Sequence, residues 1–479
     1  MLHCVKFILR RSMCYSGKMS TPETVAAHAR EGVPAALNAL CAYLRIPAIS
    51  CDPAHAEDVG RLAQTVAADL AALGFDDAVA RSLPDALPCV TASWMKRPGA
   101  PTILIYGHLD LQPVKGETWT SPPHEPTIRN GRLYARGAAD DMGGWVTHLA
   151  AIRAWFAVTG ELPCNVRLVI EGEEEIGSPN LERYMDAFPV CFQADAMVLT
   201  DCENPSIDIP GLTVSLRGIL ELTVRCTALE ADIHSGLWGG MVPDVSLALV
   251  QLISRLVDED GRVKAPRSEV PDAWCSAAWA VPLTRDVIRE GGHLCAGVEP
   301  LPARGMPPAA HLWRQPAVTI VATTLPTLDI KKNALRRSAE AILSVRVAPG
   351  MADEDLKAAF DAELVRDPPG GVKVSLEWST QPSGAWLYEP KGPAFAAADR
   401  AYTRSWGRPL LQVGVGGSIP FVALFGRRFG DLPLILNGVI DPLTTAHGPD
   451  ESLDLGIFEK AILANVYLYD ELASALTGA

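Results

Sequence analysis

Four glutamates fall within five positions in the stretch LVIEGEEEIGS, residues 168–178, directly after a run that is typical of a buried strand. They are Glu171, Glu173, Glu174 and Glu175. An unpaired buried carboxylate is costly, so a cluster of this kind is either solvated or neutralised by something cationic. The cluster therefore raises the question of a bound cation, which the polar residues elsewhere in the chain must answer.

Polar side chains also follow three other apolar runs that are typical of buried strands. The runs and the residues behind them are TILIY (102–106) with His108 and Asp110, AMVLT (196–200) with Asp201, and LPLIL (432–436) with His447. In open α/β sheets, sites form in the crevice beyond the carboxyl ends of the strands. We therefore expect these histidines and carboxylates to converge on one crevice.

Two imidazoles among several carboxylates indicate a metal site. This donor set suits zinc, with manganese and cobalt as alternatives, and the lack of nearby cysteines argues against a structural thiolate zinc site. An acid to bridge two ions is present in GAADDMGGW, where Asp140 and Asp141 precede a helix and have helix N-capping as their alternative role. Asp110 is spaced to accept the second imidazole N–H of His108, a residue that could also be a structural histidine in a turn.

The elements that must position these residues have an α/β pattern. Short apolar strands alternate with helical stretches over 22–73, 143–156 and 458–476, which predicts a mostly parallel sheet with helices on both faces. Residues 212–387 instead contain alternating strand patterns and two helical stretches, typical of an inserted α+β module. We therefore expect a main domain made of two parts, residues 22–211 and 388–479, with the inserted module over 212–387 between them. Residues 1–21 form an N-terminal extension.

Composition excludes several classes of function. A net charge of −14 argues against nucleic-acid and anionic-membrane partners, and 11 cysteines without a CxxC pair favour a reducing, cytoplasmic compartment over a disulfide framework. No apolar run approaches the ~20 residues that span a bilayer, so we expect a soluble protein. The first 18 residues contain no acidic residue, and two interpretations stay open: a transit peptide, or an artefactual upstream extension with Met19 as the true start. In either case we expect this segment to be disordered.

Together the motifs resemble the M20 family of dinuclear zinc peptidases, in particular its carnosinase-like dipeptidase and glutamate carboxypeptidase group. The resemblance runs from about residue 22 to the C-terminus. It is carried, in order, by GHLDLQP, ARGAADDMGG, EGEEEIGS, the TD after AMVL, DIHSG and AHGPDE. It implies that the inserted domain is a lid that also forms a homodimer.

The resemblance also implies roles for individual residues. His108 and Asp201 would hold one ion, Glu175 and His447 the other, and Asp140 would bridge the two ions. Asp110 would orient His108. Glu174 would be the general base that activates a water against the amide carbonyl, a choice among the four glutamates that spacing alone does not make.

Substrate contacts follow from the resemblance as well, each beside a plainer alternative. His234 in DIHSG looks like the family histidine that reaches the partner's site across the dimer, or it is a structural histidine in a glycine-rich turn. Arg346 matches an arginine for the substrate carboxylate, or it faces solvent from a strand. Asn333 lies where some relatives contact substrate, and Gly417 and Ser418 in GGSIP either present N–H groups to the carboxylate or form a tight turn.

Three departures from the family pattern put the substrate side-chain preference in doubt. Gly414 and Val415 stand where relatives often have Arg-Glu, Met142 stands in place of a lysine, and NALRR lacks the usual proline. The leading hypothesis is metal-dependent hydrolysis of dipeptides or short peptides with a free C-terminal carboxylate. The alternatives are an N-acyl-amino-acid deacylase with the same two-metal site and a catalytically silent binding protein.

Overall fold

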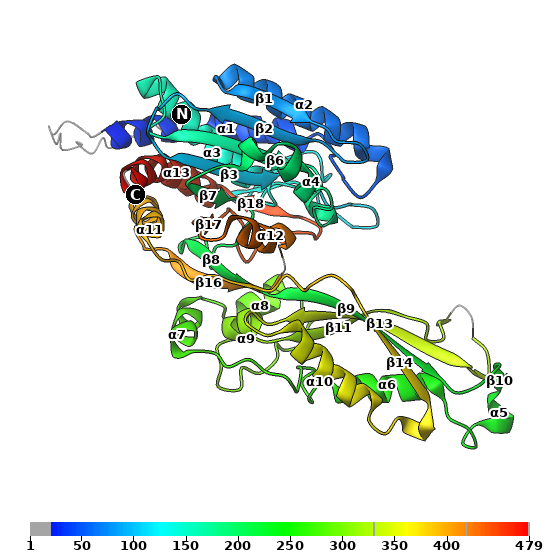
Figure 1. The fold of residues 1–479 in the computed structure, drawn as a ribbon. Helices are drawn as coiled ribbons and strands as arrows, with labels where there is room; N and C mark the ends of the chain where they lie inside the picture. Colours follow the sequence, from blue (N-terminus) through cyan, green and yellow to red (C-terminus); the bar gives the residue numbers. More distant parts are fainter. Residues whose placement is uncertain (1–20, 329–330, 418, 478–479) are drawn as a thin grey trace, which may run out of the picture.

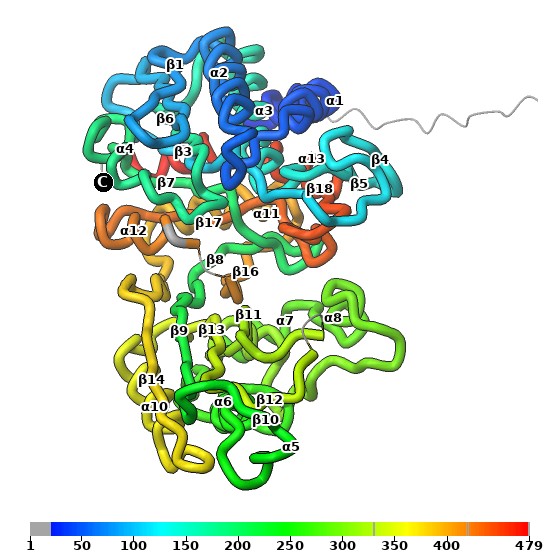
Figure 2. Tube along the Cα trace, turned by 90° about the vertical axis from the view of Figure 1, so that its right-hand side faces the viewer, coloured from blue at the N-terminus to red at the C-terminus, as the bar shows by residue number. Residues whose placement is uncertain are grey.

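The computed structural model describes residues 21–328, 331–417 and 419–477, which form a larger and a smaller lobe (Figure 1). Both ends of the described chain lie in the larger lobe, and the middle of the sequence forms the smaller one (Figures 1 and 2). The N-terminal extension expected over 1–21 lies outside the described residues except for Thr21, which begins the first helix.

A nine-stranded sheet forms the centre of the larger lobe, in the order β1-β2-β6-β3-β7-β17-β8-β15, with β16 paired to β8. The strands are β1 (Asp76–Arg81), β2 (Cys89–Trp94), β3 (Thr102–His108), β6 (Asn165–Glu171), β7 (Ala196–Leu199), β8 (Gly211–Leu216), β15 (Trp386–Leu387), β16 (Leu411–Val415) and β17 (Leu434–Leu436). The four central strands β6, β3, β7 and β17 run parallel, as predicted. Antiparallel strands flank them, because β2 pairs antiparallel with β6 and β8 with β17.

Helices cover both faces of this sheet. Along β3, Ile103 and Ile105 point into one core while Leu104 and Tyr106 point into the other, as the two-residue period of a strand requires. The first face carries α1 (Thr21–Leu44), α2 (Ala56–Leu73), α3 (Met142–Thr159), α11 (Pro393–Trp406) and α13 (Leu455–Leu476). The opposite face carries α4 (Leu181–Ala187) and α12 (Pro420–Phe429). The predicted three-layer α/β arrangement is confirmed.

The smaller lobe is built on a four-stranded antiparallel sheet in the order β11-β13-β9-β14. Its elements are β9 (Gly218–Thr227), β11 (Ala317–Thr323), β13 (Ser338–Val347), β14 (Lys373–Trp378), α6 (Val245–Arg255) and α10 (Asp353–Val365). The two helices share one core with the sheet, and burial alternates along β9 and β13. These strands lie within 218–378, because β8 and β15, at the two ends of the 212–387 segment, belong to the larger sheet.

A helical segment of the smaller lobe reaches back to the larger one. It contains α7 (Asp272–Ala280), α8 (Arg285–Gly291) and α9 (Pro308–Arg314), which lie on the side of the smaller lobe that faces β16 (Figure 1). Ala310 and Trp313 of α9 form a small core with Val413 of β16. The sequence did not predict this segment as a separate unit, although it closes one side of the space between the lobes.

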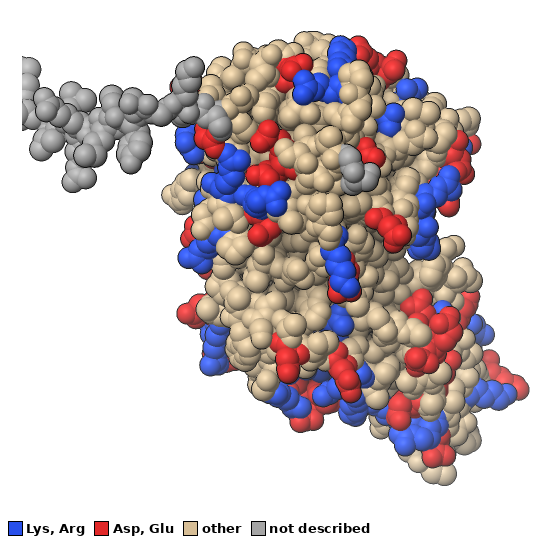
Figure 3. Space-filling model, turned by 60° about the vertical axis from the view of Figure 1, so that its left-hand side comes forward, with Lys and Arg blue, Asp and Glu red and all other residues tan. Residues whose placement is uncertain are grey.

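Two minor sheets complete the described structure. One contains β4 (Thr127–Arg129), β5 (Arg132–Tyr134) and β18 (Ser452–Asp454), and the other pairs β10 (Ile233–His234) with β12 (Ala334–Leu335) next to the short helix α5 (Ser235–Trp238). Acidic and basic side chains are interspersed over the face in Figure 3. None of the helices in the described ranges combines the length and apolar character that crossing a membrane requires.

Candidate metal centre

Five polar residues meet at the carboxyl edge of the central parallel strands. His108 is the last residue of β3, and Asp201 lies two positions beyond the end of β7. Glu175 lies in a short 3-10 turn that follows β6, and His447 lies in the loop after β17. Asp140 joins them from the glycine-rich loop before α3. The strand order β6-β3-β7-β17 makes these four strand ends neighbours, which is why residues so distant in sequence come together.

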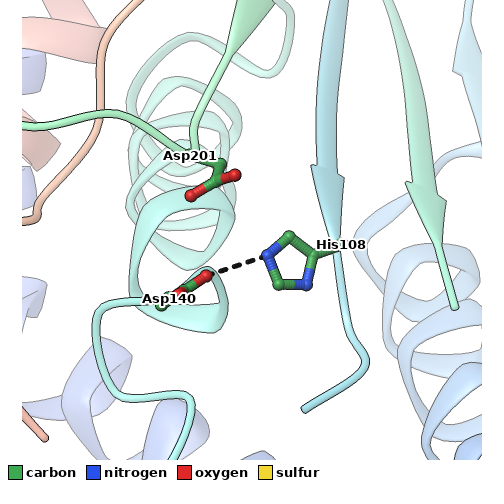
Figure 4. A group of neighbouring side chains, drawn as sticks. All are labelled: His108, Asp140 and Asp201. Carbon is green, nitrogen blue, oxygen red and sulfur yellow. Dashed lines mark hydrogen bonds and ion pairs between the residues drawn. The ribbon is translucent and has the colours of Figure 1, made fainter. Parts of the chain in front are cut away.

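The ligand atoms form two clusters that share Asp140. The atoms of His108, Asp140 and Asp201 lie within 4.8 Å of one another, and so do those of Asp140, Glu175 and His447. Figure 4 shows the first cluster, with the imidazole of His108 pointing toward Asp140 and Asp201 close by. Two imidazoles and three carboxylates around two centres fit a pair of divalent cations such as zinc, manganese or cobalt.

Asp140 presents one carboxylate oxygen to each cluster. Its Oδ1 lies 3.0 Å from Nε2 of His108, and its Oδ2 lies 3.0 Å from Nε2 of His447. The same His447 nitrogen lies 3.1 Å from Oε2 of Glu175. A carboxylate with its two oxygens directed at separate groups of ligands is the arrangement that bridges two cations.

The electrostatics of the site also fit bound cations. Burial raises the pKa of Glu174 and that of Asp201 well above the usual range, and the neighbouring Asp140 raises the pKa of Asp201 further. Burial opposes ionisation of Asp140 too, but hydrogen bonds with His108 and His447 lower its pKa. Burying several carboxylates together costs free energy unless a positive charge neutralises them. Cations bound at the two clusters would supply that charge.

Asp110 links the imidazole of His108 to the turn that carries Glu174 and Glu175. His108 Nδ1 lies 3.1 Å from the backbone oxygen of Asp110 and 3.5 Å from its carboxylate. The carboxylate accepts hydrogen bonds from the backbone N–H groups of Glu174, at 3.1 Å, and Glu175, at 3.0 Å. The nearer group to the imidazole is thus the backbone oxygen, and the carboxylate mainly fixes the glutamate turn.

The other two glutamates of the cluster make local hydrogen bonds at the end of β6. Glu171 accepts hydrogen bonds from the hydroxyl groups of Tyr106 and Ser178. Glu173 accepts a hydrogen bond from the backbone N–H of Leu87 at 2.8 Å. The four carboxylates therefore divide into two that hold the end of β6 and two that lie at the candidate metal centre.

Asp141 has a structural role that the sequence did not reveal. Although it stands at the N-cap position of α3, its side chain caps no helical N–H group. Instead its Oδ2 accepts hydrogen bonds from the backbone N–H of His108, at 3.2 Å, and from the hydroxyl of Thr200, at 2.6 Å. Asp141 thereby fastens the ends of β3 and β7 to the loop that carries Asp140.

Glu451, four residues after His447, is a second residue that sequence reasoning missed. It is fully buried, and its Oε1 accepts hydrogen bonds from the backbone N–H groups of Ala139 and Asp140, at 3.1 and 3.2 Å. Its Oε2 accepts from the guanidinium of Arg136 at 3.1 Å. One carboxylate thus ties the Asp140 loop to the His447 loop. An acidic residue that follows the histidine in AHGPDE was the available signal.

The candidate substrate residues Arg346 and Gly417 lie near the junction of the lobes. Arg346 pairs with Ile219, at the start of β9 and therefore at the end of β13 closest to the larger lobe. Burial, with a contribution from Arg346, lowers the pKa of Arg217 to about 10, and the Nε of Arg217 donates to the backbone oxygen of Gly416 at 2.8 Å. Ser418 lies outside the described residues.

His234 and Asn333 lie together, far from the metal centre of their own chain. His234 pairs with Ala334, and the N–H of Ser235 donates to the backbone oxygen of Asn333 at 3.2 Å. His234 ends β10 and Asn333 directly precedes β12, and β10 lies with α5 at the end of the smaller lobe remote from the larger one (Figure 1). The structure keeps the two as neighbours and does not bring them to the five clustered residues.

Close packing explains why residue 414 is a glycine. A Cβ at Gly414 would lie 2.5 Å from Ser215 Oγ and 2.7 Å from the Cβ of Trp313, so no side chain fits there without displacing α9. At Gly416 a Cβ would lie 2.4 Å from Leu312. This chain has Gly414-Val415 where relatives often have Arg-Glu, and the glycine lets α9 pack closely against β16.

Known proteins resemble this chain in both sequence and fold. Residues 104–474 match the model of peptidase family M20/M25/M40. Cysteinylglycine-S-conjugate dipeptidase of Corynebacterium striatum is 34% identical, over 86% of this chain and 90% of that protein. Cys-Gly metallodipeptidase dug1 of Schizosaccharomyces pombe is 28% identical, over 81% of this chain and 83% of that protein.

Solved structures agree on the fold. Human carnosine dipeptidase 1 superimposes with a TM-score of 0.77 at 22% identity, covering 95% of this chain and 99% of that one. The dipeptidase Dug1p of Saccharomyces cerevisiae gives the same values. At this level of identity the structural likeness concerns the fold alone.

Proposed function

We infer that this chain, which belongs to peptidase family M20/M25/M40, is a metal-dependent dipeptidase that acts on dipeptides or short peptides with a free C-terminal carboxylate. The observation that carries the proposal is Asp140 shared between two clusters of ligand-type side chains. The relatives that are 34% and 28% identical are both named for cysteinylglycine compounds, which supports Cys-Gly dipeptides as the first substrates to test.

We assign one ion to His108 and Asp201, the other to Glu175 and His447, and the bridging position to Asp140. Zinc is the metal we propose, with manganese and cobalt as alternatives, because the ligands are imidazoles and carboxylates. Divalent ions at these positions supply Lewis acidity toward a carbonyl oxygen and lower the pKa of water.

Glu174 is the proposed general base. It takes a proton from the attacking water and gives it to the leaving nitrogen, so that both proton transfers pass through one carboxylate. Asp110 holds the backbone of Glu174 in place, and the proximity of His108, Glu175 and Asp140 puts Glu174 beside the proposed ions. Arg346, together with the N–H groups of Gly417 and Ser418, is proposed to bind the substrate carboxylate.

A homodimer through the smaller lobe would bring His234 and Asn333 to a second copy's site. The surface near them supports this proposal, because β11 is an edge strand and apolar side chains are exposed along α5, the loop after it, α6 and β11. These side chains are Leu237, Trp238, Met241, Leu247, Val250, Ile320 and Val321. His234 from one protomer would then stabilise the negative charge that develops on the carbonyl oxygen in its partner's site.

Mixing two inactive variants tests the shared site. His234→Ala and Glu174→Gln should each lose dipeptide hydrolysis, whereas a mixture allowed to exchange subunits should recover about a quarter of wild-type activity, since one site of each mixed dimer is intact. The measurement is kcat before and after exchange, with size-exclusion chromatography to follow the dimer. If dimers exchange and no activity returns, His234 does not act across the interface.

A substrate panel tests the activity itself. With zinc, manganese or cobalt supplied, we expect kcat/KM for Cys-Gly and Ala-Gly to exceed that for N-acetyl amino acids by at least about 100-fold. N-acetyl amino acids keep the carboxylate but lack the free amine, and a site built to bind that amine rejects analogues without it. A preference for the N-acetyl compounds would favour the deacylase. Absence of hydrolysis with all three metals would favour a catalytically silent binding protein.

A further inference from the structure

A large cavity lies between the α7–α9 segment of the smaller lobe and the loops of the larger lobe. Its volume is about 920 Å³, within the range of about 300–1,000 Å³ that is typical of small-molecule sites. Much of its wall is apolar, and the apolar lining includes Val287, Ile288, Leu301, Met306, Leu312 and Trp313.

The cavity adjoins the loops that carry two of the proposed metal ligands, Asp201 and His447. Thr444, Thr445 and Ala446 line it and lead directly to His447, and Glu203, which also lines it, follows Asp201 by two positions. The end of α8 packs closely against the His447 loop, because a Cβ at Gly291 would lie 3.0 Å from the backbone oxygen of Pro442. A ligand held at the metal centre therefore has this cavity beside it.

Two arginines that line the cavity lie beside carboxylates. Arg267 pairs with Asp258 at 3.0 Å, and Arg262 lies 3.9 Å from Asp260. Gly414 contributes no side chain, because Trp313 occupies the space that one would need. The wall formed by α8 and α9 therefore favours an uncharged, apolar occupant over an acidic or basic one.

We propose that this cavity receives a bulky, uncharged apolar group carried by the substrate, so that the preferred substrates are dipeptides with a large apolar side group. The proposal rests on the proposed dipeptidase function and adds its side-chain preference. Because the cavity adjoins the His447 loop, we assign the substrate as its occupant, and the volume leaves room for an aromatic group larger than the side chains of most natural residues.

A matched pair of substrates tests this preference. S-benzyl-Cys-Gly and S-methyl-Cys-Gly are both thioethers and differ only by a phenyl ring, and burying that ring should raise kcat/KM for the benzyl compound by about 10-fold or more. Phe-Gly against Ala-Gly and Gly-Phe against Gly-Ala extend the comparison to each residue of the dipeptide. Equal kcat/KM within all three pairs, or a preference for the smaller member, would overturn the proposal.

Filling the cavity provides the second readout. Val287→Trp on α8 should lower the ratio of kcat/KM between the large and the small substrate by about 10-fold. Glu290→Trp is the matched control, because Glu290 is on the same helix, is exposed and does not line the cavity, so the ratio should stay unchanged. Leu301→Trp, at an exposed position of the wall, replaces Val287→Trp if that variant unfolds at a lower temperature.

The two proposals fail in different ways. If no dipeptide is hydrolysed with any metal, the dipeptidase function is wrong. If small and large dipeptides are hydrolysed and the folded Val287→Trp variant keeps the wild-type ratio, the function stands and the cavity does not bind the substrate.

Discussion

Replacing Glu174 with glutamine should lower kcat for dipeptide hydrolysis by about 10²–10⁴-fold while both metal ions stay bound. The amide has nearly the same shape as the carboxylate but cannot accept the proton of the attacking water. The backbone N–H of residue 174 keeps its hydrogen bond to Asp110, so the turn should not move. Steady-state kinetics and the metal content of the dialysed protein measure the two effects separately.

Two neighbouring glutamates serve as controls for this variant. Glu175→Gln should lose metal, since Glu175 belongs to one of the clusters. Glu173→Gln should mainly lower the thermal stability, because Glu173 binds the N–H of Leu87 and not a cluster. A Glu174→Gln variant that retains a tenth or more of wild-type kcat would show that another group moves the proton.

Replacing Asp140 with asparagine should remove both ions and abolish hydrolysis, a loss of about 10³-fold or more. Each oxygen of Asp140 faces a different imidazole, and an asparagine amide group cannot serve as the second anionic donor. Metal analysis after dialysis should give close to zero ions per chain, against two in the wild type. The wild type treated with a chelator should lose activity and regain it when zinc, manganese or cobalt is added back.

Asp201→Asn is the matched control for Asp140→Asn. Asp201 belongs to the His108 cluster only, so this variant should keep the ion held by Glu175 and His447. Two ions bound by Asp140→Asn, or the same stoichiometry in both variants, would contradict a bridging role for Asp140.

Much of the larger lobe could be predicted because local pattern and burial agree there. The runs at 102–106, 165–170 and 196–200 are strands β3, β6 and β7, and polar residues at their ends meet at one edge. A buried parallel strand is apolar along its length, so a polar residue just beyond it stands out. The helix predicted over 143–156 is part of α3.

The rest depends on contacts between residues distant in sequence. The roles of Asp141 and Glu451 follow from which backbone N–H groups they meet, and Glu451 meets that of Asp140, on a loop far earlier in the sequence. The run LTVSLRGILELTVRC looks like one amphipathic segment, yet β8 and β9 enter different sheets on either side of Arg217. The docking of α9 against β16 likewise depends on two glycines whose importance appears only when Trp313 and Leu312 lie beside them.

The position of β17 in the larger sheet limits the order in which the two lobes can fold during synthesis. β17 lies between β7 and β8, but the ribosome makes it only after the whole smaller lobe. The strands of the smaller lobe form one continuous stretch and can fold as the chain emerges, whereas β7 and β8 must wait with unpaired edges that attract other chains. His447 follows β17, so the ligand set of the proposed metal centre is complete only after β17 has been made.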